Sequence, residues 1–343
     1  MKVVYSDAHL RHVPQAELHG GLMVPPFENP TRVEYVLQRL RDVGWRDWVA
    51  PDPWSPEPVL RVHDADFLAF LEHAWEEWTG AGFAGEIIPG NFPARRMRQR
   101  CPRFIDGKVG YYALATETAI TSGTWEAAQA SCASAQTAQQ WVARGERAAF
   151  ALCRPPGHHA ARDLYGGYCF LNNAAVAAQQ FLDQGASRVA VLDIDFHHGN
   201  GTQDIFYERP EVLFASLHGR PEDSFPYFSG YADETGAGLG SGTTFNYPLA
   251  PGTAYPRWAE ALTQALGEVQ RFGAEALVIS LGVDTFKEDP ISSFRLESKD
   301  YLDCGKRLAQ AKLPTVFVME GGYAVEAVGV NVVNVLEGFE QAA

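Results

Sequence analysis

The stretch Arg188-Val-Ala-Val-Leu-Asp-Ile-Asp-Phe-His-His-Gly-Asn-Gly-Thr202 joins a run of apolar residues to two aspartates and two histidines. Residues two apart on an extended strand point to the same side. We therefore expect Asp193, Asp195 and His197 on one face of this strand and His198 on the other. Two carboxylates and an imidazole at the end of a buried strand indicate a bound divalent metal ion.

Composition narrows the class of protein. The chain has 343 residues, of which 46% are apolar, enough for a large buried core. Its formal net charge of -14 argues against sequence-independent nucleic-acid binding and is compatible with a cationic small substrate. No signal peptide and no apolar run of membrane-spanning length is visible. The five scattered cysteines indicate reduced thiols, so we expect a cytoplasmic protein with no membrane partner.

Apolar strands and amphipathic helices are predicted to alternate along the chain. The expected strands are Lys2–Tyr5, Ala148–Cys153, Val189–Ile194, Val212–Leu217, Phe245–Leu249, Ala276–Leu281 and Thr315–Met319. The expected helices run from Asn29-Pro30 to Gly44, from Asp64 to about Trp78 and from Thr124 to about Ala143, and over Asn172–Gln184, Thr202–Tyr207, Trp258–Phe272, Ser298–Ala311 and Val325–Phe339. This alternation predicts an α/β fold with a mostly parallel sheet covered on both faces. With no repeat or linker visible, we predict a single domain over residues 1–343.

Residues 79–107 interrupt that alternation. They are rich in Gly and Pro and contain the basic run Arg95-Arg-Met-Arg-Gln-Arg100. Loops of this length are usually functional or lie at interfaces. The basic run either binds an anion or an acidic partner surface, or is simply a solvated run of charge, which is the commoner case.

Polar residues follow five of the predicted strands. They are Arg154-Pro-Pro-Gly-His-His159, Asp195 with His197, His218, Asp284, and Glu320-Gly-Gly-Tyr323. Ligands of open parallel sheets bind beyond the carboxyl ends of the strands, so these segments predict one active site. Tyr323 follows two glycines and can donate a hydrogen bond to a developing oxyanion, although a lone loop tyrosine is more often a half-buried aromatic.

Asp195, His197 and Asp284 are the candidate metal ligands. Three protein ligands leave a position open for water and substrate, which is typical of catalytic zinc sites. Strand-end aspartates can instead cap helices or form turns, but an Asp-x-His pair with a third carboxylate favours a metal. Oxygen and nitrogen donors do not by themselves select among Zn, Fe(II), Mn and Co.

The sequence has two pairs of adjacent histidines, His158-His159 and His197-His198, and the second pair includes the candidate ligand His197. His158 and His159 are either an acid–base pair or additional metal ligands. Alternation points His198 away from the cluster, which favours a structural role there. Asp193 and Asn200 are natural partners for the far N–H of a catalytic imidazole.

Together these segments resemble the histone deacetylase superfamily, which has the arginase-like α/β fold. The matching stretches are Glu28-Asn-Pro-Thr-Arg32, Arg154-Pro-Pro-Gly-His-His159, Gly166-Gly-Tyr-Cys-Phe-Leu-Asn-Asn173, Val191–Thr202, Ser280-Leu-Gly-Val-Asp284, Asp289-Pro290 and Glu320-Gly-Gly-Tyr323. The opening Glu17–Phe27, the insertion at 79–107 and Thr116-Glu-Thr118 look most like the bacterial acetylpolyamine amidohydrolases. The resemblance implies a single arginase/deacetylase-like domain with a sheet of about eight strands.

The resemblance also implies two kinds of bound cation. Zinc is expected on Asp195, His197 and Asp284, with Fe2+, Co2+ or Mn2+ as alternatives. A structural K+ or Na+ ion is expected near Asp193, Asp195, His197 and Ser216.

Catalytic roles follow from the same resemblance. It assigns His159 as general base and then acid, with His158 beside it as electrostatic partner. Asp193 is expected to orient His158, and Asn200 to orient His159. Tyr323 and the metal are expected to stabilise the tetrahedral oxyanion.

Substrate contacts follow as well. Tyr168 and Phe225 are expected to wall a narrow tunnel, and Glu117 and Asp106 to face a distal ammonium group. The insertion at about 79–107 is expected to build a homodimer, or a higher oligomer, and to narrow the entrance.

The expected activity is removal of the acetyl group from small cationic N-acetylated polyamines, such as acetylputrescine, acetylcadaverine and acetylspermidine, to give acetate and the free amine. One alternative is a broader deacetylase of acetyllysine or small acetylamides. Another is a non-catalytic, metal-bound sensor of polyamines. A two-manganese ureohydrolase would typically carry Asp-x-His-x-Asp, whereas this chain has Asp-x-His-His-Gly.

Overall fold

The computed structural model, which describes residues 1–342, is organised around one eight-stranded sheet in which all neighbouring strands are parallel. From one edge to the other the strands are β4 (Trp48–Val49), β1 (Lys2–Val4), β5 (Ala148–Ala151), β10 (Thr315–Met319), β9 (Ala276–Leu281), β6 (Val189–Asp193), β7 (Val212–Gly219) and β8 (Thr244–Leu249). The predicted α/β fold with a parallel sheet is confirmed.

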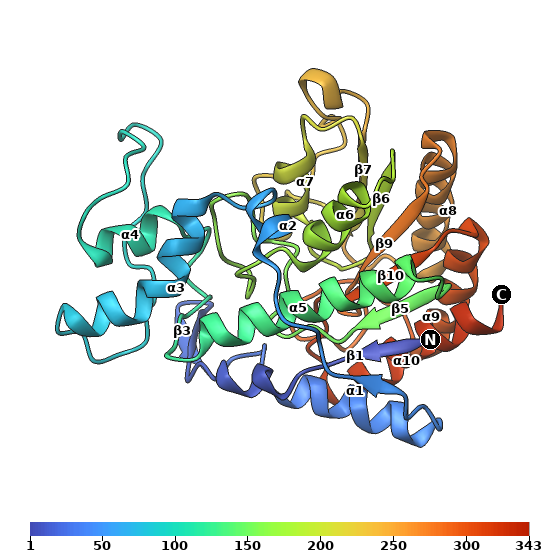
Figure 1. Ribbon diagram of the computed structural model, residues 1–343, viewed down its shortest axis with the longest axis horizontal. Helices are drawn as coiled ribbons and strands as arrows, with labels where there is room; N and C mark the ends of the chain where they lie inside the picture. Colours follow the sequence, from blue (N-terminus) through green and yellow to red (C-terminus); the bar gives the residue numbers. More distant parts are fainter. Residues whose placement is uncertain (343) are drawn as a thin grey trace.

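Helices cover both faces of this sheet (Figure 1). One face carries α5 (Thr124–Ala143) and α6 (Asn173–Asp183), and α2 (Pro56–Leu60) and α3 (Ala65–Gly80) pack into the same hydrophobic core. The other face carries α1 (Thr31–Asp42), α8 (Tyr255–Phe272), α9 (Ser298–Leu308) and α10 (Val325–Gln341). No helix within residues 1–342 is long and apolar enough to cross a membrane.

Alternate side chains of a strand pack into two different hydrophobic cores, one on each face of the sheet. In β6, Val189 and Val191 pack into the core under α5 and α6, whereas Ala190 and Leu192 pack into the core under α8 and α10. All four residues are buried. This double burial explains why the strand sequences are continuous apolar runs without polar alternation.

Several elements differ from the sequence-based expectations. Strand β7 runs on to Gly219, so His218 lies inside the strand, and the prediction that it follows the strand was wrong. The short helix α7 (Asn200–Phe206) begins at Asn200, before the expected Thr202. The N-cap position of α1 is occupied by Pro30 and not by Asn29, although the Asn29 Oδ1 atom still accepts a hydrogen bond from the Thr31 N–H, at 3.1 Å.

Short elements near the insertion were not predicted. They are α4 (Ile105–Tyr111) and a two-stranded antiparallel hairpin formed by β2 (Glu17–His19) and β3 (Leu22–Val24). In Figure 1, α3, α4 and the long loop between them extend from the end of the molecule toward which β1 and β5 point. The insertion therefore lies on the side of the fold where the carboxyl ends of the strands place the candidate site.

Candidate active site

The side chains of Asp195, His197 and Asp284 converge just beyond the ends of β6 and β9. Their nearest oxygen and nitrogen atoms all lie within 4.8 Å of one another. The His197 Nδ1 atom is 2.8 Å from the Asp284 Oδ2 atom and 3.3 Å from the Asp195 Oδ1 atom. This nitrogen and the two carboxylates thus face a common centre.

Backbone groups hold the two carboxylates in place. The N–H of Phe196 donates to the Asp284 Oδ1 atom at 2.7 Å, and the N–H of Gly321 donates to the Asp195 Oδ2 atom at 2.8 Å. Both aspartates are completely buried. Burial and the nearby charge of Asp195 raise the pKa of Asp284 well above its usual value. Two buried carboxylates that repel each other and share one imidazole form a donor set suited to a divalent cation.

Two glycines make this convergence possible. A Cβ atom at Gly282 would lie 1.9 Å from the Asp195 Oδ2 atom. A Cβ atom at Gly321 would lie 2.6 Å from the same oxygen and 2.7 Å from the Asp284 Oδ2 atom. Any side chain at either position would occupy the space of the carboxylates, so the cluster requires glycine at both.

The adjacent histidines have different partners. The His158 Nδ1 atom lies 2.9 Å from the Asp193 Oδ2 atom, and the His159 Nδ1 atom lies 2.6 Å from the Asn200 Oδ1 atom. Since an amide oxygen only accepts, the His159 Nδ1 atom carries the proton and its Nε2 atom has a free lone pair. Burial opposes the charge on His158, but the carboxylates of Asp193 and Asp195 raise its pKa to about 10. His159 is thus the member of the pair that can accept a proton.

Tyr323 is held by contacts from distant parts of the chain. Its backbone N–H donates to the Asp289 Oδ2 atom at 2.7 Å. The guanidinium of Arg32 lies 4.8 Å from the centre of the Tyr323 ring, and the Arg32 Nε atom donates to the Gly322 carbonyl at 2.7 Å. Burial raises the pKa of Tyr323 well above 10, so its hydroxyl keeps its proton and remains a hydrogen-bond donor.

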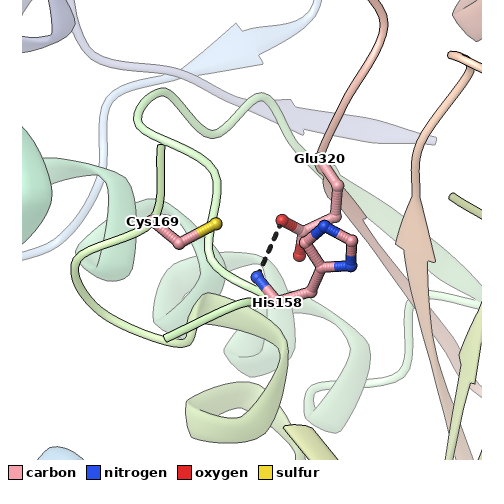
Figure 2. A group of neighbouring side chains, drawn as sticks. All are labelled: His158, Cys169 and Glu320. Atoms are coloured by element: carbon pink, nitrogen blue, oxygen red, sulfur yellow. Dashed lines mark hydrogen bonds between the residues drawn. The ribbon is translucent and has the colours of Figure 1, made fainter. Parts of the chain in front are cut away.

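Glu320, His158 and Cys169 form a second buried group next to the first (Figure 2). The Glu320 Oε2 atom accepts hydrogen bonds from the N–H of Gly157 at 2.6 Å and of His158 at 3.1 Å. Burial raises the pKa of the Cys169 thiol well above 9 and that of Glu320 to about 7. A neutral thiol is a poor metal ligand. We therefore interpret Glu320 as a structural group, whose hydrogen bonds connect the loop of His158 and His159 to the loop of Tyr323.

A cavity of about 390 Å³ reaches the candidate metal-binding cluster at His197. Predicted site residues that line it are His159, His197, Tyr323, Glu117, Tyr168 and Phe225. The Tyr168 ring centre lies 5.5 Å from that of Tyr323, and the Phe225 ring centre lies 5.1 Å from that of His159. In the cavity wall, the Tyr168 ring therefore lies next to Tyr323 and the Phe225 ring next to His159.

The remaining predicted residues lie behind this surface or away from it. Buried beneath it are His158, Asp193, Asp195, Asp284 and Ser216. Ser216 is opposite Asp193 in the pairing of β6 with β7, and its hydroxyl is 2.8 Å from the His218 Nδ1 atom. Asp106 lies on α4 and, within residues 1–342, is not part of the cavity lining.

Sequence reasoning assigned no role to several buried charged residues near the site. Glu28 accepts from Arg32 Nη1 at 3.1 Å and from Arg154 Nε at 2.8 Å, and all three side chains are completely or almost completely buried. Glu17 also lines the cavity. The motifs that resemble the family contain all four of these residues, Glu17, Glu28, Arg32 and Arg154. Only the three-dimensional path of the chain shows what they contact.

The comparisons with known proteins agree with this geometry. The family model described as "Histone deacetylase domain" matches residues 26–339. The chain belongs to the histone deacetylase family. Deacetylases of this family depend on a metal ion, and Asp195, His197 and Asp284 are the candidate ligands here.

Individual relatives place this histone deacetylase family member in a bacterial branch. It is 56% identical to the acetylpolyamine amidohydrolase of Mycoplana ramosa, covering 98% of this chain and 99% of the relative. It is 55% identical to acetylpolyamine amidohydrolase 1 of Pseudomonas aeruginosa over the full length of both. The crystal structure of an acetylpolyamine aminohydrolase from Burkholderia pseudomallei matches with a TM-score of 0.94 and 36% identity, covering 100% and 99% of the two chains.

Proposed function

We propose that the protein is a zinc-dependent amidohydrolase that removes acetyl groups from N-acetylated polyamines. The observation that carries this proposal is that His159, Tyr323 and His197, the last a member of the Asp195–His197–Asp284 cluster, line one cavity. The other walls of the cavity carry carboxylates, among them Glu117, which suit a cationic substrate. Relatives named acetylpolyamine amidohydrolase, aligned over nearly the whole chain, support the substrate class.

The donor set fits a divalent ion. Asp195, His197 and Asp284 would hold it and leave room for ligands from the cavity side. A divalent ion held there would supply Lewis acidity toward an acetyl oxygen and would lower the pKa of a water molecule. Two anionic ligands offset the charge of a divalent ion, which suits binding of an uncharged amide.

His159 performs the proton transfers in this proposal. Asn200 fixes the Nδ1 proton of His159, so its Nε2 atom takes the proton of the attacking water and later delivers it to the leaving amine. His158, held by Asp193, provides positive charge beside the reaction and orders the pair.

Tyr323 stabilises the charge that develops on the acetyl oxygen. Its protonated hydroxyl donates a hydrogen bond to this oxygen in the tetrahedral state. Tyr168 and Phe225 exclude water around the methylene chain, and Glu117 binds the distal ammonium group. Asp106, which lies on α4, remains a predicted ammonium contact.

A substrate panel tests the proposed activity. Purified protein loaded with zinc, iron or cobalt is given acetylputrescine, acetylcadaverine, acetylspermidine, an acetyllysine peptide and an acetylated histone, and acetate release is measured. We expect rapid hydrolysis of the acetylpolyamines and slow hydrolysis of the histone, because a narrow, acidic cavity admits a slim cation and excludes a folded protein. The reverse ranking would identify a broader acetyllysine deacetylase. Tight binding of acetylpolyamines without acetate release would identify a sensor.

We further propose that the insertion at 79–107 forms a homodimer. It exposes large apolar side chains, among them Met97 at 64% and the neighbouring Phe104 at 59%. Exposed apolar side chains gathered on one projecting segment favour association. Light scattering is expected to give twice the chain mass for the wild type and the monomer mass for Met97→Asp combined with Phe104→Asp. Leu239→Asp, at an exposed position in the short 3-10 helix Gly238–Gly240, is the matched control and should stay dimeric. A monomeric wild type would contradict the proposal.

Two finer assignments accompany the proposed function. A K+ or Na+ ion beside Asp193, Asp195, His197 and Ser216 is supported by the pairing of β6 with β7, which places Ser216 opposite Asp193. A cytoplasmic location is supported by the five free cysteines, which suit a reducing compartment.

A further inference from the structure

Glu17 is a buried carboxylate in the wall of the catalytic cavity. It is the first residue of β2, its side chain is only 2% exposed, and it lines the cavity together with its neighbours Leu18 and His19. The Glu17 Oε1 atom accepts the hydroxyl of Tyr168 at 2.9 Å, and its Oε2 atom accepts the N–H of Phe27 at 3.2 Å.

Neither hydrogen-bond partner of Glu17 carries a positive charge. Within residues 1–342, no Lys, Arg or His forms a salt bridge with Glu17 or with Glu117, the other glutamate of the cavity wall. The contrast with Glu28 is informative, because that deeper carboxylate is paired with both Arg32 and Arg154. Glu28 is thus paired with two cationic side chains of the protein, whereas Glu17 and Glu117 in the cavity wall form no salt bridge with one.

The surroundings of Glu17 disfavour its negative charge. Burial, together with the nearby charges of Glu117 and Glu28, raises its pKa to about 7, against the opposing effect of its two hydrogen bonds. A bound cation would remove this penalty, because opposite charge favours the ionised carboxylate. Glu17 also lines the cavity that contains His159, His197 and Tyr323.

Tyr168 separates the two unpaired carboxylates. Glu117 accepts the N–H of Gly167 at 2.7 Å, at the backbone end of Tyr168, whereas Glu17 accepts the Tyr168 hydroxyl at the far end of the ring. The two carboxylates therefore meet Tyr168 at its two ends, Glu117 next to its backbone and Glu17 at its hydroxyl. Two spaced carboxylates match a chain that carries two separated ammonium groups.

We propose that Glu17 is a specificity-determining residue that binds a second ammonium group of the substrate. With Glu117 it makes the cavity prefer acetylated triamines, which carry two positive charges, over acetylated diamines, which carry one. This inference rests on the proposed deacetylase function and adds to it a rule for the charge of the substrate.

The test compares substrates within the variant Glu17→Gln. Glutamine keeps an oxygen for the Tyr168 hydroxyl and removes the negative charge. The kcat/KM for acetylspermidine is expected to fall about tenfold more than that for acetylputrescine, mainly through KM, as expected for one charged hydrogen bond. The effect on uncharged N-acetylbutylamine is small by comparison. The ratio of kcat/KM values for two substrates does not depend on the fraction of folded protein, so partial misfolding of the variant would not change it.

Two further variants separate charge recognition from packing. Tyr168→Phe removes the hydroxyl partner and leaves the Glu17 charge, so it should lower activity without favouring the acetyldiamine. Glu222→Gln removes an exposed charge next to the cavity-lining loop and should leave the substrate ratios unchanged. Equal losses on all three substrates in Glu17→Gln would overturn the inference and leave the deacetylase function intact. Absence of acetate release from every substrate by the wild type would overturn both.

Discussion

Asp284→Asn is expected to lose the bound metal ion and to lower kcat for acetate release by about 10³-fold or more. Asparagine can keep the hydrogen bond from the Phe196 N–H, because that bond is made by the Oδ1 atom. Its amide nitrogen would then replace the Oδ2 oxygen that faces His197 and Asp195. The substitution thus removes one charged donor and preserves the fold around it.

Thermal stability gives a second readout for this variant. Without metal, burial and the charge of Asp195 raise the pKa of Asp284, so removing the charge should leave the Tm of the apo variant equal to or above that of the apo wild type. Zinc at a thousandfold excess over its Kd stabilises the wild type by about 4 kcal/mol, and this gain should vanish in the variant. Metal content by mass spectrometry, Tm with and without zinc, and acetate release provide the measurements.

The matched control is Asp233→Asn, which changes an exposed aspartate on a surface loop. It should keep the metal content, the zinc-dependent gain in Tm and the rate of the wild type. An Asp284→Asn protein that retained one tightly bound ion per chain and the wild-type rate would exclude Asp284 from the metal site.

Tyr323→Phe is expected to lower kcat by about 10²- to 10³-fold with little change in KM, the usual cost of losing one oxyanion donor. Phenylalanine keeps the ring against Arg32, and the backbone N–H still donates to Asp289. The variant therefore isolates the hydroxyl. Steady-state kinetics on acetylputrescine and metal content, which should be unchanged, provide the measurements.

Tyr227→Phe is the control for the loss of a phenolic hydroxyl at the same cavity. The Tyr227 side chain lines the entrance and is 49% exposed, so its kcat should stay within about twofold of the wild type. If Tyr323→Phe were as active as the wild type, another group would have to stabilise the oxyanion.

The metal-binding cluster could be predicted from the sequence because its residues are tied to strand ends. The periodicity of β6 and β9 determines where Asp195 and Asp284 emerge, and parallel strands bring such ends to one edge of a sheet. The convergence of His159 with Tyr323 follows from the same rule, because β5 and β10 are neighbours.

The contacts made by Arg32 and Glu17 could not be predicted in the same way. Arg32 lies in the first turn of α1, where an arginine is usually solvated, yet it contacts a carbonyl 290 residues away. Glu17 belongs to a hairpin of two three-residue strands, too short for a periodic pattern. Similarly, His218 was placed beyond β7 because the apolar run ends at Leu217, whereas ladder pairing with β8 extends the strand to Gly219.

The position of β10 in the sheet has a consequence for synthesis on the ribosome. This strand leaves the ribosome after every other strand, yet it lies between β5, which leads to the His158–His159 loop, and β9, which leads to Asp284. Before it emerges, the strands made so far form two groups that are not neighbours, one leading to His159, the proposed base, and one leading to the candidate metal ligands. The arrival of β10 joins them, and the residues directly after it supply Glu320 to the base loop, the Gly321 N–H to Asp195 and the Tyr323 hydroxyl. Translation therefore cannot yield a competent catalyst until nearly the whole chain has been made, and acetate release would report complete folding.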